Sequence, residues 1–287
     1  MREITGKTRL AGVFATPIRH SVSPMLQNKA FETLGIDAVY LAFDLGTDRI
    51  VRAIESIRNL EMLGGNLSMP NKMAAIPLMD ELSEAAEIVG AINTIVNTEG
   101  KLKGHITDGK GFMRSLVELD LQMKNQKMTL IGAGGAATAI MVQAAFDGVR
   151  EIAVYNQRDD FYEKINDKIS LVNARTNCFV HLEDLEDEQT FQQDVRESIL
   201  LVNATSVGMS PNTGMTPITN FEVIRPELTV VDVIYTPRET LFLKEAAKRG
   251  ATTANGLGMQ LYQAAENFKL WTGKEMPLDE VRDLLNR

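Results

Sequence analysis

The chain has 287 residues, of which 44% are hydrophobic and 24% are charged. This length and composition predict about two globular domains and exclude disorder as the general character of the chain. Its 30 Lys and Arg residues against 38 Asp and Glu residues give a formal charge of −8, which argues against binding to duplex nucleic acid. The single cysteine, Cys178, excludes an intramolecular disulfide and a cysteine-rich zinc site.

Neither a membrane segment nor a metal motif stands out in the sequence. No apolar run approaches the ~18 residues of a membrane helix, and the first ten residues lack the apolar core of a secretion signal. The histidines at 20, 105 and 181 lack the spacing of a helical metal pair. We therefore expect a cytoplasmic protein with a small-molecule partner, and no metal, membrane or nucleic acid.

Apolar runs alternate with helical patterns along the chain, which is typical of α/β architecture. In the first third, one helix is expected to begin at Ser23, a favoured cap residue, followed by Pro24 in the first turn. A second helix is expected at residues 48–60, with Ile50, Val51, Ile54 and Ile57 facing the core. Strands are expected at residues 10–16, 39–43, 64–68 and 91–96, and a turn at 69–72.

A second α/β unit is expected after Asp108. Its strands are predicted at residues 127–131, 151–155, 199–202 and 229–233. Helices are predicted at residues 111–119, 240–249, 258–271 and 278–285. Two more are predicted, one that follows the strand at 127–131 and ends at residue 146, and one that begins near residue 161. The sequence therefore predicts a two-domain α/β fold, with residues 1–109 and 256–287 in one domain and residues 110–255 in the other.

A glycine-rich turn joins the strand at 127–131 to the following helix, with the sequence Gly132-Ala133-Gly134-Gly135-Ala136-Ala137. A strand followed by G-x-G-x-x-A and a helix is typical of a dinucleotide-binding site. Gly132 would permit the tight turn and Gly134 would let the backbone approach a pyrophosphate, whose charge the helix N-terminus attracts. We predict a dinucleotide cofactor; the alternative is a packing turn that binds no ligand.

The segment after the next strand bears on the choice of cofactor. Asp159 could accept hydrogen bonds from ribose hydroxyls and would repel a 2′-phosphate, whereas Arg158 could stack on adenine or bind that phosphate. NAD is therefore predicted in preference to NADP. The alternative is that Asp159 caps the following helix, and both roles can coexist. Glu151 has the spacing of a ribose-binding acid but would lie at the wrong end of its strand.

Hydride transfer at such a cofactor needs a proton donor or acceptor beside the reacting carbon. Lys72 follows a proline-containing turn, and Asp108 lies at the junction between the two halves. A lone lysine is most often a solvated surface residue, so the residues alone leave this role open.

Motifs from residue 20 to residue 263 resemble, in order, those of the shikimate dehydrogenase family. They are His20-Ser21-Val22-Ser23-Pro24, Asn66-Leu67-Ser68-Met69-Pro70-Asn71-Lys72, Gly90-Ala91-Ile92-Asn93-Thr94, Thr107-Asp108-Gly109, the glycine turn, Asn203-Ala204-Thr205-Ser206-Val207-Gly208-Met209, Asp232-Val233-Ile234-Tyr235 with Pro237 and Thr240, and Gly256-Leu257-Gly258-Met259 with Gln263. The sequences M-P-N-K, Q-R-D-D and L-W-T-G-K look most like the branch that acts on both quinate and shikimate.

The resemblance implies an α/β substrate domain closed by the C-terminal helices and a Rossmann domain inserted into it. It implies an oxidoreductase of aromatic amino acid (chorismate) biosynthesis that interconverts shikimate and 3-dehydroshikimate, and quinate and 3-dehydroquinate, with NAD(P). Lys72 would relay the proton with help from Asp108. Substrate would be bound by Ser21, Ser23, Ser68, Asn93, Tyr235 and Gln263. Cofactor would be bound by Gly132, Ala133, Gly134, Gly135, Ala136, Asn156, Arg158, Asp159, Thr205, Ser206, Val233 and Gly256.

Three positions depart from the family pattern. Ser68 stands where threonine is common, which keeps the hydroxyl and loses a methyl group. Ile106 stands where an Asn usually precedes Thr-Asp, and Gln157 stands where an Arg usually follows Asn, which weakens any phosphate clamp for NADP. The loss of the amide at 106 leaves open an alternative function, a dinucleotide-responsive binding protein of the same fold without turnover. The sequence separates neither quinate from shikimate nor a homodimer from other oligomeric states.

Overall fold

The structure is a computed structural model that describes residues 3–286. The chain divides into two compact units. The first comprises the chain up to Thr107 together with the chain from Leu261 onward, and the second spans Asp108–Gln260. These limits lie a few residues from the boundaries predicted at 109/110 and 255/256.

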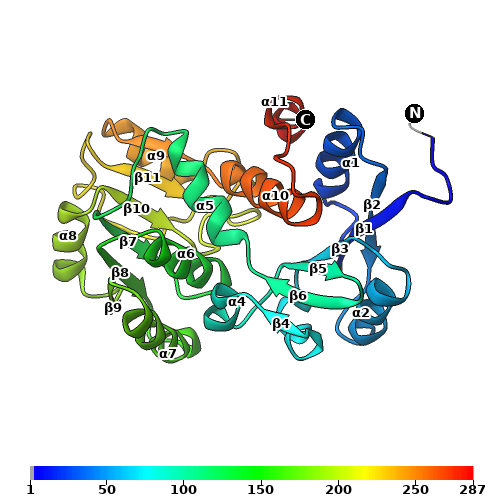
Figure 1. The fold of residues 1–287 in the computed structure, drawn as a ribbon. Coiled ribbons are helices and arrows are strands. Elements are labelled where there is room, and N and C mark those ends of the chain that lie inside the picture. The colour runs from blue at the N-terminus through cyan, green and yellow to red at the C-terminus, as the bar shows by residue number, and fades with distance from the viewer. Residues whose placement is uncertain (1–2, 287) are drawn as a thin grey trace. The chain divides into compact units, whose positions relative to one another are not determined.

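The first unit is built on a six-stranded mixed sheet in the order β2-β1-β3-β5-β6-β4 (Figure 1). Strand β1 pairs in parallel with β2 and β3, and β5 pairs antiparallel with β3 and β6. The strands are β1 (Arg9–Ala15), β2 (Ala38–Asp44), β3 (Gly64–Leu67), β4 (Glu81–Leu82), β5 (Thr94–Thr98) and β6 (Lys101–His105).

Aromatic side chains join the helices of the first unit to one another and to its sheet. Phe31 packs on Phe268 at 5.3 Å between ring centroids, and Tyr40 packs on Trp271 at 5.8 Å. The indole of Trp271 also donates to the carbonyl of Ile95 at 2.9 Å. The helices are α1 (Ser23–Thr33), α2 (Ile50–Asn59), α3 (Asn71–Ala74), the 3-10 turn η1 (Ile76–Leu78), α4 (Glu84–Val89), α10 (Leu257–Thr272), which begins in the second unit, α11 (Leu278–Arg282) and the 3-10 turn η2 (Asp283–Asn286).

The second unit is a doubly wound sheet in which every strand pair is parallel, in the order β12-β11-β10-β7-β8-β9 (Figure 1). The strands are β7 (Lys127–Ile131), β8 (Glu151–Asn156), β9 (Phe179–Asp184), β10 (Leu200–Asn203), β11 (Thr229–Asp232) and β12 (Thr252–Ala254). The helices are α5 (Asp108–Val117), α6 (Gly135–Phe146), α7 (Asp160–Arg175), α8 (Glu188–Glu197) and α9 (Leu241–Lys248).

This strand order is that of a Rossmann fold, in which the order of the strands reverses between β7 and β10. Helices α8 and α9 pack against the sheet face that presents Ile131, Ala153 and Tyr155. Gly109 permits the close crossing of α5 and α6, because a Cβ there would lie 2.1 Å from the carbonyl oxygen of Ala139. The predicted α/β fold with a Rossmann-type unit is confirmed.

Most long elements match the sequence expectation, but three local predictions are wrong. The turn expected at 69–72 is only partly present, because helix α3 begins at Asn71. Ser23 is the first residue of α1 rather than its cap, and its own N–H donates to Ser21 Oγ at 3.3 Å. Val51 is 51% exposed, and Ala53 is buried in its place, because a helix turns ~100° per residue and Val51 lies beside the buried Ile50.

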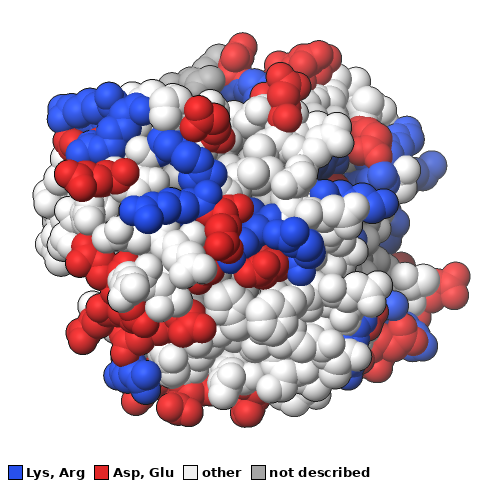
Figure 2. All heavy atoms as spheres, turned by 90° about the vertical axis from the view of Figure 1, so that its left-hand side faces the viewer, with Lys and Arg blue, Asp and Glu red and all other residues white. Residues whose placement is uncertain are grey.

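No helix among residues 3–286 is both long and apolar enough to cross a membrane. Figure 2 shows the face of the second unit on the left-hand side of Figure 1, where acidic and basic side chains are intermingled. This face therefore offers no continuous basic surface. The cytoplasmic localisation stays a prediction.

Candidate active site

The glycine turn after β7 has the geometry that a phosphate-binding turn requires. Gly132 has a φ of 119°, and an added Cβ would lie 3.1 Å from the backbone of Ala204. Its N–H donates to the carbonyl of Tyr155 at 2.7 Å, which fixes the turn against β8. A Cβ at Gly134 or Gly135 would meet no atom within 4 Å. The backbone at the start of α6 therefore has open space beside Gly134 and Gly135, which fits the close approach of a pyrophosphate.

The loop after β8 brings together the residues predicted to bind the adenosine ribose. Asp159 Oδ1 accepts from the backbone N–H groups of Phe161 at 2.8 Å and Tyr162 at 3.2 Å, so its helix-capping role is confirmed. The same oxygen accepts from Asn156 Nδ2 at 2.9 Å. Arg158 Nε donates to Asp184 Oδ2 at 2.6 Å, and its guanidinium lies 5.2 Å from the ring of Tyr162.

The loops after β10 and β11 are held by a buried aspartate that the sequence analysis did not single out. Asp232 accepts from Asn203 Nδ2 at 3.1 Å and from the Thr240 hydroxyl at 2.8 Å. Burial raises the pKa of Asp232, although these hydrogen bonds act in the opposite direction. Its place in the D-x-x-Y-x-P-x-x-T motif was the available signal. The bonds order the loop that contains Val233 and Tyr235, and Tyr235 is 44% exposed.

Two residues that the motifs predict to bind cofactor, Thr205 and Gly256, also make contacts that shape their own loops. The Thr205 hydroxyl donates to Asn203 Oδ1 at 2.7 Å and accepts from the backbone N–H of Val207 at 3.1 Å, while Ser206 is exposed. Gly256 lies so close to β11 that an added Cβ would be 1.9 Å from the carbonyl oxygen of Val233. Their contact with a cofactor stays a prediction.

In the first unit, Lys72 lies in the short helix α3, where a turn was expected. Its carbonyl accepts from the N–H of Ile92 at 3.0 Å, which ties α3 to the segment before Asn93. The preceding residue, Asn71, is fully buried and donates to the carbonyls of Phe14 and Leu45. The position of Lys72 is therefore fixed by packing on both sides, a property that the motif alone did not show.

Asn93 and Gln263, two predicted substrate residues, belong to one network of buried amides and hydroxyls. Asn93 Oδ1 accepts from the N–H of Thr107 at 2.9 Å, and its Nδ2 donates to the Thr107 hydroxyl at 3.0 Å. That hydroxyl lies 2.7 Å from Asn267 Oδ1, and Asn267 Nδ2 donates to Gln263 Oε1 at 3.0 Å. Asn267 was not singled out from the sequence, since it lies outside the motifs, the last of which ends at Gln263.

The proposed catalytic residues stand in different units. Lys72 belongs to the first, and Asp108 opens both α5 and the second unit, directly after Thr107. Ile106 is buried, so the Thr107–Asp108 segment is held by the contacts of Thr107 with Asn93 and Asn267. Ser21, Ser23 and Ser68 are half-buried. The pairing of Lys72 with Asp108 and the substrate contacts of the serines stay predictions.

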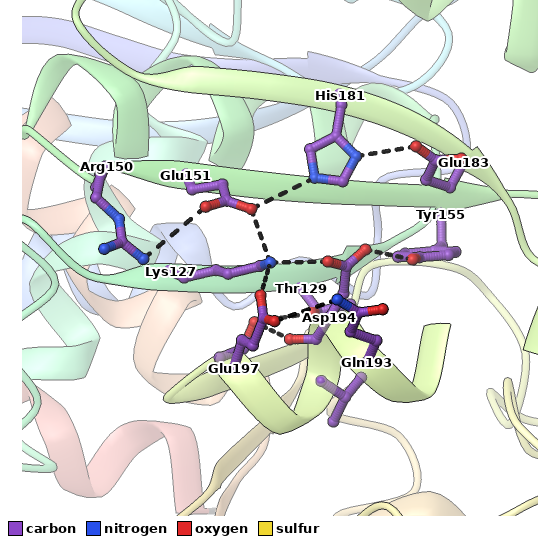
Figure 3. Close-up of polar contacts among 12 residues, drawn as sticks. Lys127, Thr129, Arg150, Glu151, Tyr155, His181, Glu183, Gln193, Asp194 and Glu197 are labelled. Atoms are coloured by element: carbon purple, nitrogen blue, oxygen red, sulfur yellow. Dashed lines mark hydrogen bonds and ion pairs between the residues drawn. The ribbon is translucent and has the colours of Figure 1, made fainter. Parts of the chain in front are cut away.

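A second polar cluster lies at the first residues of β7 and β8, whereas the glycine turn follows the end of β7. Lys127 Nζ is 2.7 Å from carboxylate oxygens of Glu151, Asp194 and Glu197, and Figure 3 shows all three pointing at the ammonium. Asp194 also accepts from the hydroxyl of Tyr155. Glu151, Asp194 and His181 come close enough to hold a metal ion. The ammonium of Lys127 already fills the centre, so this cluster is an ion-pair network.

Known proteins resemble this chain along nearly its whole length. The model of the shikimate dehydrogenase substrate binding domain matches residues 13–95, and that of the shikimate 5′-dehydrogenase C-terminal domain matches residues 256–285. The shikimate dehydrogenase (NADP(+)) of Listeria innocua is 48% identical over 98% of this chain and 97% of its own length. That of Streptococcus uberis is 50% identical over 98% and 97%.

A solved structure extends the likeness to three dimensions. Shikimate 5-dehydrogenase from Listeria monocytogenes, in complex with shikimate and NAD, is 47% identical and covers 99% of each chain with a TM-score of 0.96. Relatives of this identity and coverage share one fold and one ancestry with the chain. The chain belongs to the shikimate dehydrogenase family.

Proposed function

We propose that this chain interconverts shikimate and 3-dehydroshikimate by hydride transfer with a nicotinamide dinucleotide. The main support is the whole-length similarity to a relative whose structure was solved in complex with shikimate and NAD. The open glycine turn at the start of α6 is consistent with a dinucleotide there. The relatives are named as dehydrogenases, which favours turnover over the binding-only alternative. The domain roles follow: residues 1–109 and 256–287 bind substrate, and residues 110–255 bind cofactor.

In this proposal the chain orients the substrate and moves one proton. The amide of Asn93, which bonds Thr107, and that of Gln263, which bonds Asn267, bind ring hydroxyls together with the hydroxyl of Ser68. Ser21 and Ser23 bind the substrate carboxylate near the start of α1. The nicotinamide, when bound, accepts or supplies the hydride. Lys72 takes or returns the proton of the reacting hydroxyl, and Asp108 orients that hydroxyl.

The test of this mechanism is Lys72→Met, compared with Lys103→Met as a matched control. Lys103 lies on β6 in the same unit, where its ammonium is 3.5 Å from Glu81. We expect Lys72→Met to lower kcat by ~10²-fold or more, with a smaller effect on KM for shikimate, as is typical for loss of a general acid or base. Lys103→Met should leave both unchanged. Equal kcat in the two variants would remove Lys72 from the mechanism.

For the cofactor, we propose NAD in preference to NADP. Among the residues that the structure describes, the hydrogen bonds to Asp159 fall on Oδ1, so Oδ2 can accept from ribose hydroxyls while the helix cap is retained. The carboxylate would repel a 2′-phosphate, and Arg158 is held by Asp184. The relatives named for NADP(+) make this the point most in need of measurement.

Asp159→Asn removes the charge but keeps an oxygen that can cap α7. We expect it to narrow the ratio of kcat/KM for NAD over NADP by roughly tenfold, the effect of ~1.4 kcal/mol. Asp187→Asn is the matched control, because Asp187 caps α8 in the same way through the N–H of Thr190. An unaltered ratio in Asp159→Asn would show that Asp159 only caps its helix.

Quinate is proposed as a second substrate, on the strength of the M-P-N-K, Q-R-D-D and L-W-T-G-K sequences. Steady-state rates with quinate and shikimate, each with NAD and NADP, measure this directly. No turnover of quinate under conditions that turn over shikimate would contradict it. A homodimer, one of the oligomeric states that the sequence leaves open, is tested by light scattering on the same sample.

A further inference from the structure

The side chain of Asn267 lies at the centre of the buried network in the first unit. It is 1% exposed and projects from α10. Its Oδ1 lies 2.6 Å from the hydroxyl of Thr94 and 2.7 Å from that of Thr107, and its Nδ2 lies 3.0 Å from Gln263 Oε1. One amide therefore connects the hydroxyls of Thr94, the first residue of β5, and Thr107, which lies between β6 and α5, to a residue proposed to bind substrate.

The distances determine which way this amide faces. Hydrogen bonds from hydroxyl to oxygen are shortest near 2.7–2.8 Å, whereas those from amide nitrogen centre near 2.9–3.0 Å. The two short contacts therefore belong to the oxygen of Asn267, and the longer contact belongs to its nitrogen. Because nitrogen and oxygen positions in an amide are assigned from such networks, the neighbouring donors provide an independent check.

Those donors agree with the assignment. The Thr94 hydroxyl accepts from Asn66 Nδ2 at 3.0 Å, and the nitrogen end of Asn66 is fixed because it also donates to the carbonyl of Asn93. The Thr107 hydroxyl accepts from Asn93 Nδ2, whose orientation is fixed by the backbone N–H of Thr107. Each hydroxyl has one proton, and the nearest acceptor for both is the oxygen of Asn267.

We infer that Asn267 is a positioning residue that fixes the carboxamide of Gln263 as a hydrogen-bond donor toward the substrate. Because Gln263 Oε1 accepts from Asn267, the amide hydrogens of Gln263 are the group that it presents to a further partner. The substrate atom opposite must then be an acceptor, such as a ring hydroxyl oxygen. This inference rests on the proposed function, in which Gln263 binds substrate.

Two substitutions test the inference, one by removing the donor to Gln263 and one by replacing it with an acceptor. Asn267→Leu removes the donor to Gln263, while the Thr94 and Thr107 hydroxyls keep Asn93 Oδ1 as an acceptor at 2.9 and 3.1 Å. Asn267→Asp places an oxygen opposite Gln263 Oε1, so Gln263 must turn and present its oxygen to the substrate. We expect KM for shikimate to rise roughly threefold in Asn267→Leu and roughly tenfold in Asn267→Asp, with kcat within about twofold of the wild type.

The same substitutions are made in a Gln263→Ala background. If Asn267 acts through Gln263, neither raises KM further there, because coupled residues are not additive. Asn97→Ala is the matched control: Asn97 is an amide of β5 that bonds the carbonyls of Ile57 and Met62, and its loss should reduce stability without changing KM. Asn267→Leu adds no charge, so it decides the matter if Asn267→Asp fails to fold.

The outcomes separate the inference from the proposed function. A wild-type enzyme that does not turn over shikimate contradicts the proposed function. If the wild type is active, the inference is contradicted, and the proposed function is not, by either of two results. One is an unchanged KM in the folded Asn267 variants, and the other is a KM that rises equally with and without Gln263. A rise that vanishes in the Gln263→Ala background supports it.

Discussion

The second unit buries an ammonium among three carboxylates, whereas the first unit buries a network of amides and hydroxyls. Lys127 is 3% exposed and its partners come from β8 and α8. Asn267 is 1% exposed, and its partners come from β5, α10 and the segment before α5. The charged cluster lies at the strand ends opposite the glycine turn, and the neutral network includes Asn93 and Gln263, which we propose to contact substrate.

The difference teaches what each kind of contact is suited to. Burial by itself lowers the pKa of Lys127, but the hydrogen bonds that its ammonium donates to Asp194, Glu151 and Glu197 outweigh burial and raise the pKa. The ammonium therefore stays charged and fastens strand to helix, without selecting which atom faces a ligand. A neutral amide presents a donor at one end and an acceptor at the other, so its orientation specifies the partner.

The largest expected effect is on the charged cluster. Lys127→Met keeps the length of the side chain but leaves the buried Asp194 and the part-buried Glu151 without the ammonium, which should cost about 3–5 kcal/mol of unfolding free energy. Urea unfolding followed by far-UV circular dichroism measures the loss of unfolding free energy. The kcat with shikimate should stay near the wild-type value in the folded fraction. A loss below ~1 kcal/mol would mean that the carboxylates need no ammonium, and the contrast with the neutral network would then fail.

The difference in unfolding free energy between the wild type and Lys127→Met should depend on pH. The hydrogen bond from Lys127 holds the pKa of Glu197 below its ordinary value of 4.5, so its contribution is complete above pH 4.5 and is lost as the pH falls through the lower folded value. The pKa of Lys127 is raised above 10.5, so its contribution is complete below that pH. The stability gap between the wild type and Lys127→Met should narrow in acid, because protonation relieves the carboxylates that lack their counter-ion in the variant. A gap that widens in acid would contradict these directions.

The sequence predicted the glycine turn and the Rossmann unit because both depend on local signals. The strand at 127–131, the glycines and the following helix are contiguous, and periodicity and steric requirements act within a few residues. The cap at Asp159 was predicted for the same reason. The short elements between residues 81 and 105, among them β4, α4 and β6, were missed because two to six residues carry too little periodicity.

Neither buried network was predicted, because their members are far apart along the chain. Lys127 is 67 residues from Asp194, and Thr94 is 173 residues from Asn267. Their contacts exist only once two sheets and their covering helices have formed. A lysine at a strand start and an asparagine in a helix both look like solvated residues in the sequence, so the motifs showed which residues could face ligands but not what holds them.

A smaller effect is expected in the neutral network. Thr94→Val removes one hydroxyl, yet Asn66 Nδ2 keeps the carbonyl of Asn93 and Asn267 Oδ1 keeps the hydroxyl of Thr107. Because no buried group loses its last partner, the cost should be about 0.5–1.5 kcal/mol, the net value of one hydrogen bond. Thr98→Val, at the exposed end of the same strand, is the control. A loss as large as that of Lys127→Met would show that neutral networks are equally costly to break.

The smallest effect is expected at the outer edge of the charged cluster, in Glu197→Gln. The side chain of Glu197 is 52% exposed, so its ion pair with Lys127 at 2.7 Å is screened by water and should be worth roughly 0.2–1 kcal/mol. Glu151→Gln, at the same distance from Lys127 but only 23% exposed, should cost more in the same unfolding experiment. If the two substitutions cost the same, the number of charges rather than their burial would set the strength of the cluster. If Glu151→Gln costs more, the burial of each carboxylate sets the strength of its ion pair with Lys127.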